Sequence, residues 1–217
     1  MFSVKFDMPS AASLKFNPHA SYFTSEEKAC IQAACCRTSE VSRTVLQALT
    51  RPMIDSKTSN LIAEWFGATL PKDVVVGARK MDTFIQGGGT VTFVDMRNKQ
   101  ERLIQNPNNP ASDAIVPMTA CDYAYVKLLP AFKSTGGAHV GSGMKLFLGE
   151  RFFAPTKTLT DRTATIYHEL SHKLLALEDI KYGTVNCRQL AKMSPAQALK
   201  NPDNWCYFAT SFIYTWP

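Results

Sequence analysis

The chain has 217 residues, of which 45% are hydrophobic, and a formal net charge of +6. That length suits one domain that buries about 70% of the surface of its unfolded chain. No run approaches the roughly 18 apolar residues of a membrane span, which excludes an integral membrane segment. The 24 lysines and arginines are scattered over the sequence, so a basic solvated surface is expected and nucleic-acid binding is not.

The N-terminal residues lack an apolar segment of the length that a secretory signal requires. A cytosolic protein, a mature form and export without such a signal all agree with this. The cysteines form no Cys-x-x-Cys pair, which argues against a structural zinc knot. Their even number is compatible with disulfides in an oxidising compartment, although some are expected to be small buried hydrophobes. We predict a secreted or periplasmic protein, exported without a recognisable signal peptide. The six are Cys30, Cys35, Cys36, Cys121, Cys187 and Cys206.

Helices are expected to dominate the first part of the chain, residues 1–70. After an irregular start over residues 1–22, the sequence predicts helices over 24–36, 39–49 and 56–67. The first opens with a capping-box pattern, and the third places its apolar residues on one face.

Short β-branched runs follow this helical part. Residues 74–76, 83–85 and 91–94 are predicted strands, separated by glycines or polar turns. Two further strands are expected over 124–129 and 145–149. The last of these leads into the helix over residues 168–172 that is described next, so we expect it to lie nearest the functional site.

The most informative motif is His168-Glu169-Leu170-Ser171-His172. Residues four apart lie on one face of a helix, so His168 and His172 can both direct an imidazole nitrogen at one cation. Glu169 lies one position along, where it can reach a water at that cation without ligating it. A zinc ion held in this way needs one more protein ligand and one open position for water.

A carboxylate just past this helix can fold back to the same ion. Glu178 and Asp179 are both placed to do so, and Gly183 offers a helix-ending turn. Thr160 or Asp161 is expected to cap the metal helix at its start.

Three closing helices are expected over 186–193, 194–200 and 202–214. Pro195 and Pro202 stand at their favoured first-turn positions.

From about residue 146 to residue 212 the sequence resembles the aspzincin metallopeptidases, the deuterolysin and peptidyl-Lys endopeptidase group. In that family the HExxH motif is followed by Asp-x-x-Tyr-Gly, which Asp179, Tyr182 and Gly183 match. A later family segment, AL-x-NADNY-x-YFA, is matched from Ala198 to Ala209. Family members bind zinc through two His and one Asp. The resemblance therefore implies one catalytic zinc ion on His168, His172 and Asp179, with Glu178 as a rival third ligand.

Glu169 is the expected general base, because it can take a proton from the water at the metal. The resemblance also implies roles for two other residues. Tyr182 is the expected donor to the developing oxyanion, unless it only packs the turn. In lysine-specific members an Asp at the place of Asp203, and an acid three residues later, attract a substrate lysine. Here the later residue is Cys206, which weakens that selection.

From the residues alone, Asp203 has two other roles open to it. Its charge suits the N-terminus of the last helix, and either Asp161 or Asp203 could orient a ligand histidine.

These features together predict one α+β domain over residues 1–217, with a zincin-like metalloprotease fold. It should contain N-terminal helices, a small mixed sheet, the HExxH helix and closing C-terminal helices, with the metal site in residues 140–217. In zincins an edge strand beside the cleft binds the substrate backbone by strand addition.

The predicted function is a zinc metalloendopeptidase, secreted as a bacterial toxin or effector, that acts on a protein or peptide. An inhibitor or immunity protein is a further expected partner. The alternatives are a hydrolase of peptidoglycan stem peptides and an idle zinc-binding module. Retention of Glu169 argues against the idle module, because a structural site has no use for a base.

Overall fold

The computed structural model describes residues 1–6, 23–95 and 144–217, together with the backbone of residues 124–126. The strands and helices in it are β1 (Ser3–Phe6), α2 (Ser25–Leu49), α3 (Ser56–Phe66), α4 (Pro71–Gln86), β2 (Thr90–Asp95), β3 (Ala124–Val126), β4 (Met144–Leu148), the 3-10 helix η2 (Glu150–Phe153), α6 (Leu159–Leu175), α7 (Thr184–Met193), α8 (Pro195–Ala198) and α9 (Pro202–Thr210). None of the described helices is long and apolar enough to cross a membrane.

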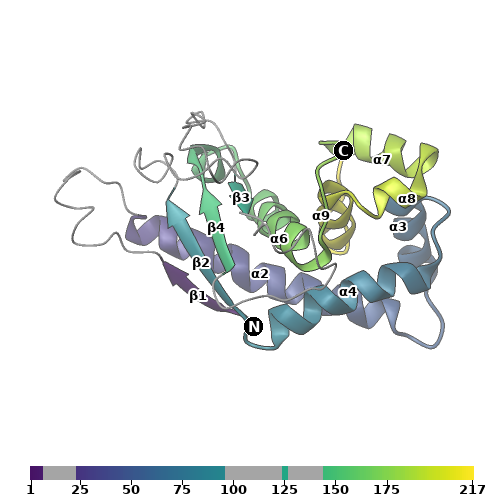
Figure 1. The fold of residues 1–217 in the computed structure, drawn as a ribbon, viewed down its shortest axis with the longest axis horizontal. Coiled ribbons are helices and arrows are strands. Elements are labelled where there is room, and N and C mark those ends of the chain that lie inside the picture. The colour runs from purple at the N-terminus through teal and green to yellow at the C-terminus, as the bar shows by residue number, and fades with distance from the viewer. Residues whose placement is uncertain (7–22, 96–123, 127–143) are drawn as a thin grey trace, which may run out of the picture.

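The sheet lies on one side of α6, and α3, α7 and α8 lie on the other (Figure 1). Its strand order is β1-β2-β4-β3. β1, β2 and β4 are parallel, and β3 is antiparallel to β4, with Tyr125 opposite Phe147. The predicted small mixed sheet and the α+β class are therefore confirmed. β4 is an interior strand, because β2 and β3 occupy both of its edges.

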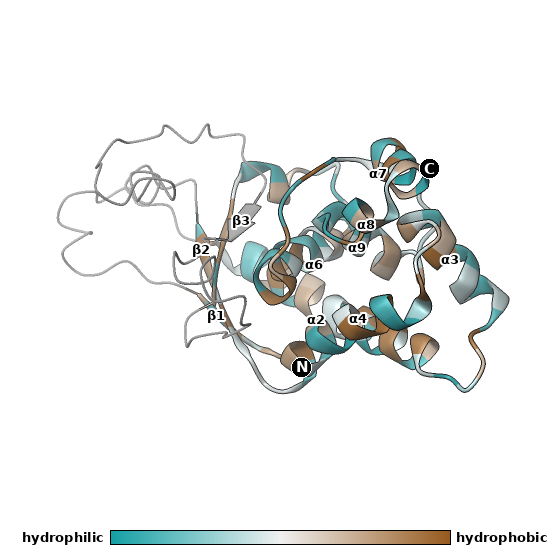
Figure 2. Ribbon diagram, turned by 45° about the vertical axis from the view of Figure 1, so that its right-hand side comes forward, coloured by the Kyte–Doolittle hydropathy of each residue, from teal (hydrophilic) through white to brown (hydrophobic). Residues whose placement is uncertain are grey.

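The helix α6, which carries the HExxH motif, is held in the middle of the core. Ile166, Leu170 and Leu174 recur at intervals of four and are buried on one face, with Tyr167 beside them. That face packs against α2, α4 and α9. Figure 2 shows hydrophobic and hydrophilic residues on different faces of these helices. The hydrophobic contacts fix the position of α6 and so of the histidines that it carries.

The start of α6 differs from the prediction. Thr158, not Thr160 or Asp161, is the N-cap residue, and its hydroxyl accepts from the Asp161 amide. Asp161 in turn accepts from the Thr158 amide at 2.8 Å. The two residues form a capping box, which satisfies backbone donors that the first turn leaves without partners.

Two predictions about the N-terminal helices need correction. The expected helices over 24–36 and 39–49 are one continuous helix, α2, because no glycine or proline separates them. Buried Thr38 sits inside it, with its hydroxyl bonded to the Ala34 carbonyl at 2.8 Å. The capping box at Thr24 and the third helix, α3, are as predicted.

The predicted strands over 74–76 and 83–85 are wrong, because this segment is the helix α4. Pro71 occupies its first turn, and the buried residues Val74, Ala78, Met81 and Ile85 follow at helical intervals. The 3.6-residue period of burial outweighs the β-propensity of the valines.

At the N-terminus, residues expected to be irregular form β1, which pairs with β2. Residues 7–22 and 127–129 of other predicted elements lie outside the described residues. The predicted strands β2 and β4 and the closing helices α7, α8 and α9 are present.

The five described cysteines are all free: Cys30, Cys35, Cys36, Cys187 and Cys206. The expected disulfides are therefore absent among them. Cys121 lies outside the described residues.

Candidate metal centre

Three predicted ligands meet at one point beside α6. Nε2 of His168 lies 3.1 Å from Nε2 of His172. Oδ1 of Asp179 lies 3.3 Å from the former and 3.4 Å from the latter. The two histidines are four residues apart on the helix, and their side chains are about one-eighth exposed, at 12% and 13%.

The spacing of these three atoms fits a tetrahedral metal. Zinc bonds of about 2.0–2.1 Å at the tetrahedral angle place neighbouring ligand atoms about 3.3–3.4 Å apart. The measured edges of 3.1, 3.3 and 3.4 Å therefore form one face of such a tetrahedron. The group has three protein donors, which is the number that a catalytic zinc site takes from the protein. The residues present fit a zinc ion.

A sharp turn after α6 brings Asp179 to the histidines. Ala176 adopts the left-handed conformation at φ 56° and ends the helix. It is the one non-glycine residue with positive φ in the part of the chain that the structure describes. The predicted helix-ending glycine, Gly183, instead precedes α7 as its N-cap. Glu178, the rival ligand, is exposed and lies outside the donor group.

Glu169 is buried beside the donors and is not one of them. Its side chain is 4% exposed, and its Oε2 atom has no hydrogen-bond partner among the described residues. Burial raises the pKa of Glu169, and the neighbouring His168 and His172 offset part of that rise. A buried carboxylate oxygen without a partner is costly, so it marks a place where another group or a water is needed.

The other ring nitrogen of each histidine is held by the protein. His168 Nδ1 lies 2.7 Å from Oδ1 of Asp203, and His172 Nδ1 lies 2.9 Å from the Leu177 carbonyl. Such partners fix the ring orientation and leave Nε2 as the ligand atom. Between the two candidates, Asp203 therefore orients a histidine, and Asp161 caps the helix.

Asp203 has protein partners on both of its oxygens. Its Oδ2 accepts from the Gly183 amide at 2.8 Å, opposite the His168 contact of Oδ1. The side chain is 11% exposed. This geometry gives Asp203 a positioning role, and its contact with a substrate lysine stays a prediction.

Cys206, the residue that replaces the family's second acid, is buried near the same histidine. His168, Asp203 and Cys206 form a second group within ligand reach, but it shares His168 with the first group. The Cys206 thiol lies 3.3 Å from the Asp203 carbonyl, and burial raises its pKa to about 12. A thiol that keeps its proton is a poor metal ligand.

Tyr182 stands at the open side of the centre. It is 61% exposed, and its ring stacks on His168 at 6.5 Å between centroids. Partial burial and the bond to the Asp179 carboxylate raise the pKa of Tyr182, so the phenol keeps its proton. This places a hydrogen-bond donor next to the candidate metal ligands, as the resemblance to the family implied.

Opposite charges also hold the candidate metal ligands together. Burial lowers the pKa of His168, but hydrogen bonds to Asp179 and Asp203 outweigh it and leave that pKa well above its usual range. Burial raises the pKa of Asp179, but the bonds from His168 and His172 hold it far below its usual range. The carboxylate is thus charged and available as a ligand at neutral pH.

Asn201 is a site residue that the sequence did not assign. It is fully buried, and its side chain contacts the backbone of the segment that carries Asp179 and Tyr182. Its place beside Asp203 in the family-like segment was the only signal that could have pointed to it.

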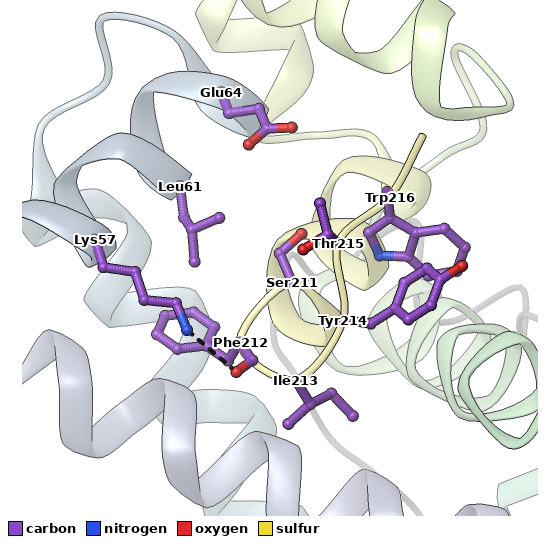
Figure 3. Close-up of a pocket in the computed structure, with 9 residues that line it drawn as sticks. All are labelled: Lys57, Leu61, Glu64, Ser211, Phe212, Ile213, Tyr214, Thr215 and Trp216. Carbon is purple, nitrogen blue, oxygen red and sulfur yellow. Dashed lines mark hydrogen bonds between the residues drawn. The ribbon is translucent and has the colours of Figure 1, made fainter.

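A pocket of 480 Å³ lies elsewhere, between α3 and the C-terminal residues (Figure 3). Lys57 and Glu64 of α3 line it together with the C-terminal residues Phe212 and Trp216. None of the predicted site residues lines this pocket, so we do not assign the chemistry to it.

The architecture and the candidate donors fit the zincin-like class of folds: an HExxH helix beside a small mixed sheet, with a candidate third ligand folded back from beyond the helix. Within that class, residues 131–210 match the family described as lysine-specific metallo-endopeptidase, the aspzincins. The resemblance to the aspzincins is thus confirmed.

Related proteins and a solved structure are also similar to this chain. The chain is 44% identical over 68 residues to an extracellular protease of Aeromonas hydrophila, a match covering 30% of this chain and 20% of that protein. It is 39% identical over 67 residues to a peptidyl-Lys metalloendopeptidase of Armillaria mellea, covering 30% of this chain and 19% of that protein. The matches thus span about a fifth of each relative's length. A zinc peptidase from Grifola frondosa shares the fold at a TM-score of 0.59 and 20% identity, over 87% of this chain and 97% of that one.

Proposed function

We propose that the chain is a zinc-dependent endopeptidase, with His168, His172 and Asp179 as the metal ligands. The observation that carries this proposal is the tetrahedral face formed by the three donor atoms. The buried carboxylate of Glu169 beside that face supports hydrolysis in particular, because a site that only held a metal would not need it.

Zinc bound there supplies a Lewis acid that acidifies water and polarises a substrate carbonyl. Glu169 then takes a proton from the attacking water and later passes it to the departing amine. Its raised pKa suits both steps, because a group that must accept and return a proton works best near the working pH.

Tyr182 donates a hydrogen bond to the substrate oxygen as negative charge builds on it. Its raised pKa supports this role, since the phenol keeps the proton that it must share.

The substrate backbone lies along β3 in this proposal. The strand around Leu146 was expected to serve, but β4 pairs on both edges and cannot accept another strand. Among the described strands β3 pairs only with β4, and it packs beside α6. Its other edge is therefore the one beside the metal helix where an extended peptide can add.

A preference for a basic residue just after the cut is a finer part of the proposal. The family description and the name of the Armillaria relative support it. Both oxygens of Asp203 are engaged with the protein, and Cys206 carries no charge, so we expect a weak preference and not a strict requirement.

We also propose that the protein acts outside the cell that makes it, as a toxin or effector. The name of the Aeromonas relative supports an extracellular place of action. An inhibitor or immunity protein in the producing cell belongs to this part of the proposal. Fractionation of producing cells, with the protein followed by antibody, tests the location.

The test of the activity uses two substrates. The zinc-loaded protein is incubated with a mixed peptide library and, separately, with purified peptidoglycan sacculi, and the products are read by mass spectrometry. We expect cuts in ordinary peptides that a chelator abolishes and added zinc restores. Muropeptide release without peptide cleavage would favour a cell-wall hydrolase. Tight zinc binding with neither product would leave an idle binding module.

A further inference from the structure

The segment that carries Asp179 has little regular structure of its own. Residues 176–183 lie between α6 and α7. The backbone groups in such a segment must find partners outside it, or be solvated.

Asn201 supplies several of those partners. Its Oδ1 accepts from the amides of Ile180 at 2.9 Å and Lys181 at 3.1 Å, and its Nδ2 donates to the Lys181 carbonyl at 2.9 Å. The first of these amides belongs to the residue directly after Asp179. One side chain thus binds both N–H and C=O groups of the backbone that directly follows the ligand.

Asn201 is itself rigidly held. It is fully buried, and its Nδ2 also donates to Oδ1 of Asn204 at 2.6 Å. Asn204 is equally buried and donates to the carbonyls of Trp65 in α3, at 2.6 Å, and Cys187 in α7, at 3.0 Å. The contacts of Asn201 therefore tie the ligand segment to two helices that take no part in metal binding.

Asp203 completes the arrangement two residues further on. It bonds to the Gly183 amide on one side and to His168 on the other. The stretch from Asn201 to Asn204 thereby holds both components of the donor group: the helix with the histidines and the segment with the carboxylate.

We propose that Asn201 is a positioning residue that holds Asp179 in ligand geometry before any metal binds. This rests on the proposed ligand role of Asp179. Preorganisation of this kind lowers the entropy lost on binding, because the segment is already ordered. Loss of residues that orient metal ligands typically weakens metal affinity about 10- to 100-fold.

The first experiment needs no variant. Hydrogen exchange of the metal-free wild-type protein is followed residue by residue by NMR. The amides of Ile180 and Lys181 should exchange slowly, at rates close to those of the flanking helices α6 and α7. Rapid exchange of both amides without metal, followed by protection only after zinc is added, would overturn the proposal.

The second experiment compares Asn201→Ala with Thr210→Val. Thr210 is a matched control, because it is also fully buried and polar in the same C-terminal region, and it bonds to the Cys206 carbonyl at 2.6 Å. It has no bond to residues 176–183. Zinc affinity is measured by competition with a chelator, and the coordination is read from the visible absorption spectrum after cobalt replaces zinc.

We expect Asn201→Ala to weaken zinc binding about 10- to 100-fold and to change the cobalt spectrum. Thr210→Val should lower the unfolding temperature and leave both readings as in wild type. Equal zinc affinity and an identical cobalt spectrum in Asn201→Ala would contradict the proposal. If that variant does not fold, the exchange experiment still decides.

Asp179→Ala separates this inference from the proposed function. If Asp179→Ala changes the cobalt spectrum and Asn201→Ala does not, only the positioning role fails. If Asp179→Ala itself leaves the spectrum unchanged, the ligand assignment fails.

Discussion

Nδ1 of His168 lies 2.7 Å from Oδ1 of Asp203, on the opposite side of the ring from the donor group. A carboxylate at this distance favours a proton on Nδ1, so in the neutral ring Nε2 keeps the lone pair that a metal needs. The contact links α9 to α6, two helices that pack closely. It makes the position of a ligand depend on the last helix of the fold.

Asp203→Asn should weaken zinc binding about 10- to 100-fold while the protein still folds. The amide keeps the shape of the side chain but removes the charge that fixes the proton on Nδ1. Asp161→Asn is the matched control, since Asp161 is a carboxylate at the start of α6 that only caps the helix. Chelator competition measures both variants, and equal affinities would contradict the positioning role.

Asp179→Ala should weaken zinc binding much more than Glu178→Ala. Asp179 contributes one corner of the donor face, whereas the neighbouring Glu178 lies outside the donor group. Metal content after dialysis, read by elemental analysis, checks the pair. A loss confined to the Glu178 variant would reverse the ligand assignment.

Glu169→Gln should keep zinc and lose hydrolysis. The amide cannot take a proton, and loss of general acid-base help typically costs about 10²- to 10⁴-fold in rate. Turnover on a peptide identified from the library gives the measurement, and Glu178→Gln controls for the loss of a nearby carboxylate. Turnover within a few-fold of wild type would rule out Glu169 as the base.

Tyr182→Phe should lower kcat more than it raises KM, because the phenol acts mainly in the transition state. Zinc content should not change, since the ring stays in place against His168. Tyr214→Phe alters another exposed tyrosine, which lies at the pocket by α3 and not at the donor group. If Tyr182→Phe is as active as that control, the tyrosine only packs the turn.

Zinc affinity should fall as the pH is lowered from about pH 8 to about pH 5.5, because protons compete for the histidines. The pKa values of His168 and His172 in the metal-free protein are raised, chiefly by Asp179 against the effect of burial. Protons therefore begin to compete above the usual histidine pKa of about 6.5. Chelator competition across the range checks this, and affinity that starts to fall only below that value would contradict it.

Spacing along one helix could be predicted from the sequence. His168 and His172 are four apart, and one helical turn brings them together whatever surrounds the helix. The capping box at Thr24 and the prolines that start α8 and α9 are similarly local, so their positions followed from a few neighbouring residues. The third ligand followed from the resemblance to a family, since Glu178 and Asp179 are equally placed by distance along the chain.

Local sequence patterns gave wrong predictions where the burial of side chains and the pairing of strands determine the structure. The valines of 74–76 favour a strand by propensity, yet the residues that must be buried in α4 repeat with a helical period. β4 looked like the strand at the cleft because it precedes the metal helix, but pairing with β3 makes it interior. Strand order is set by contacts between distant segments, which no local pattern contains.

The sequence by itself determined the helix that carries the HExxH motif and the pairing of its two histidines, and it indicated the chemistry that we propose. Only the tertiary structure brings Asp179, the carboxylate that the resemblance indicated, to the two histidines, because that depends on the left-handed turn at Ala176 and on the bonds to Asn201. It also decided that Asp203 orients His168, since the two residues lie 35 positions apart and meet only when α9 packs on α6. Side-chain chemistry can be read along a chain, but the partner of each group is fixed by the packing of elements that are distant in sequence.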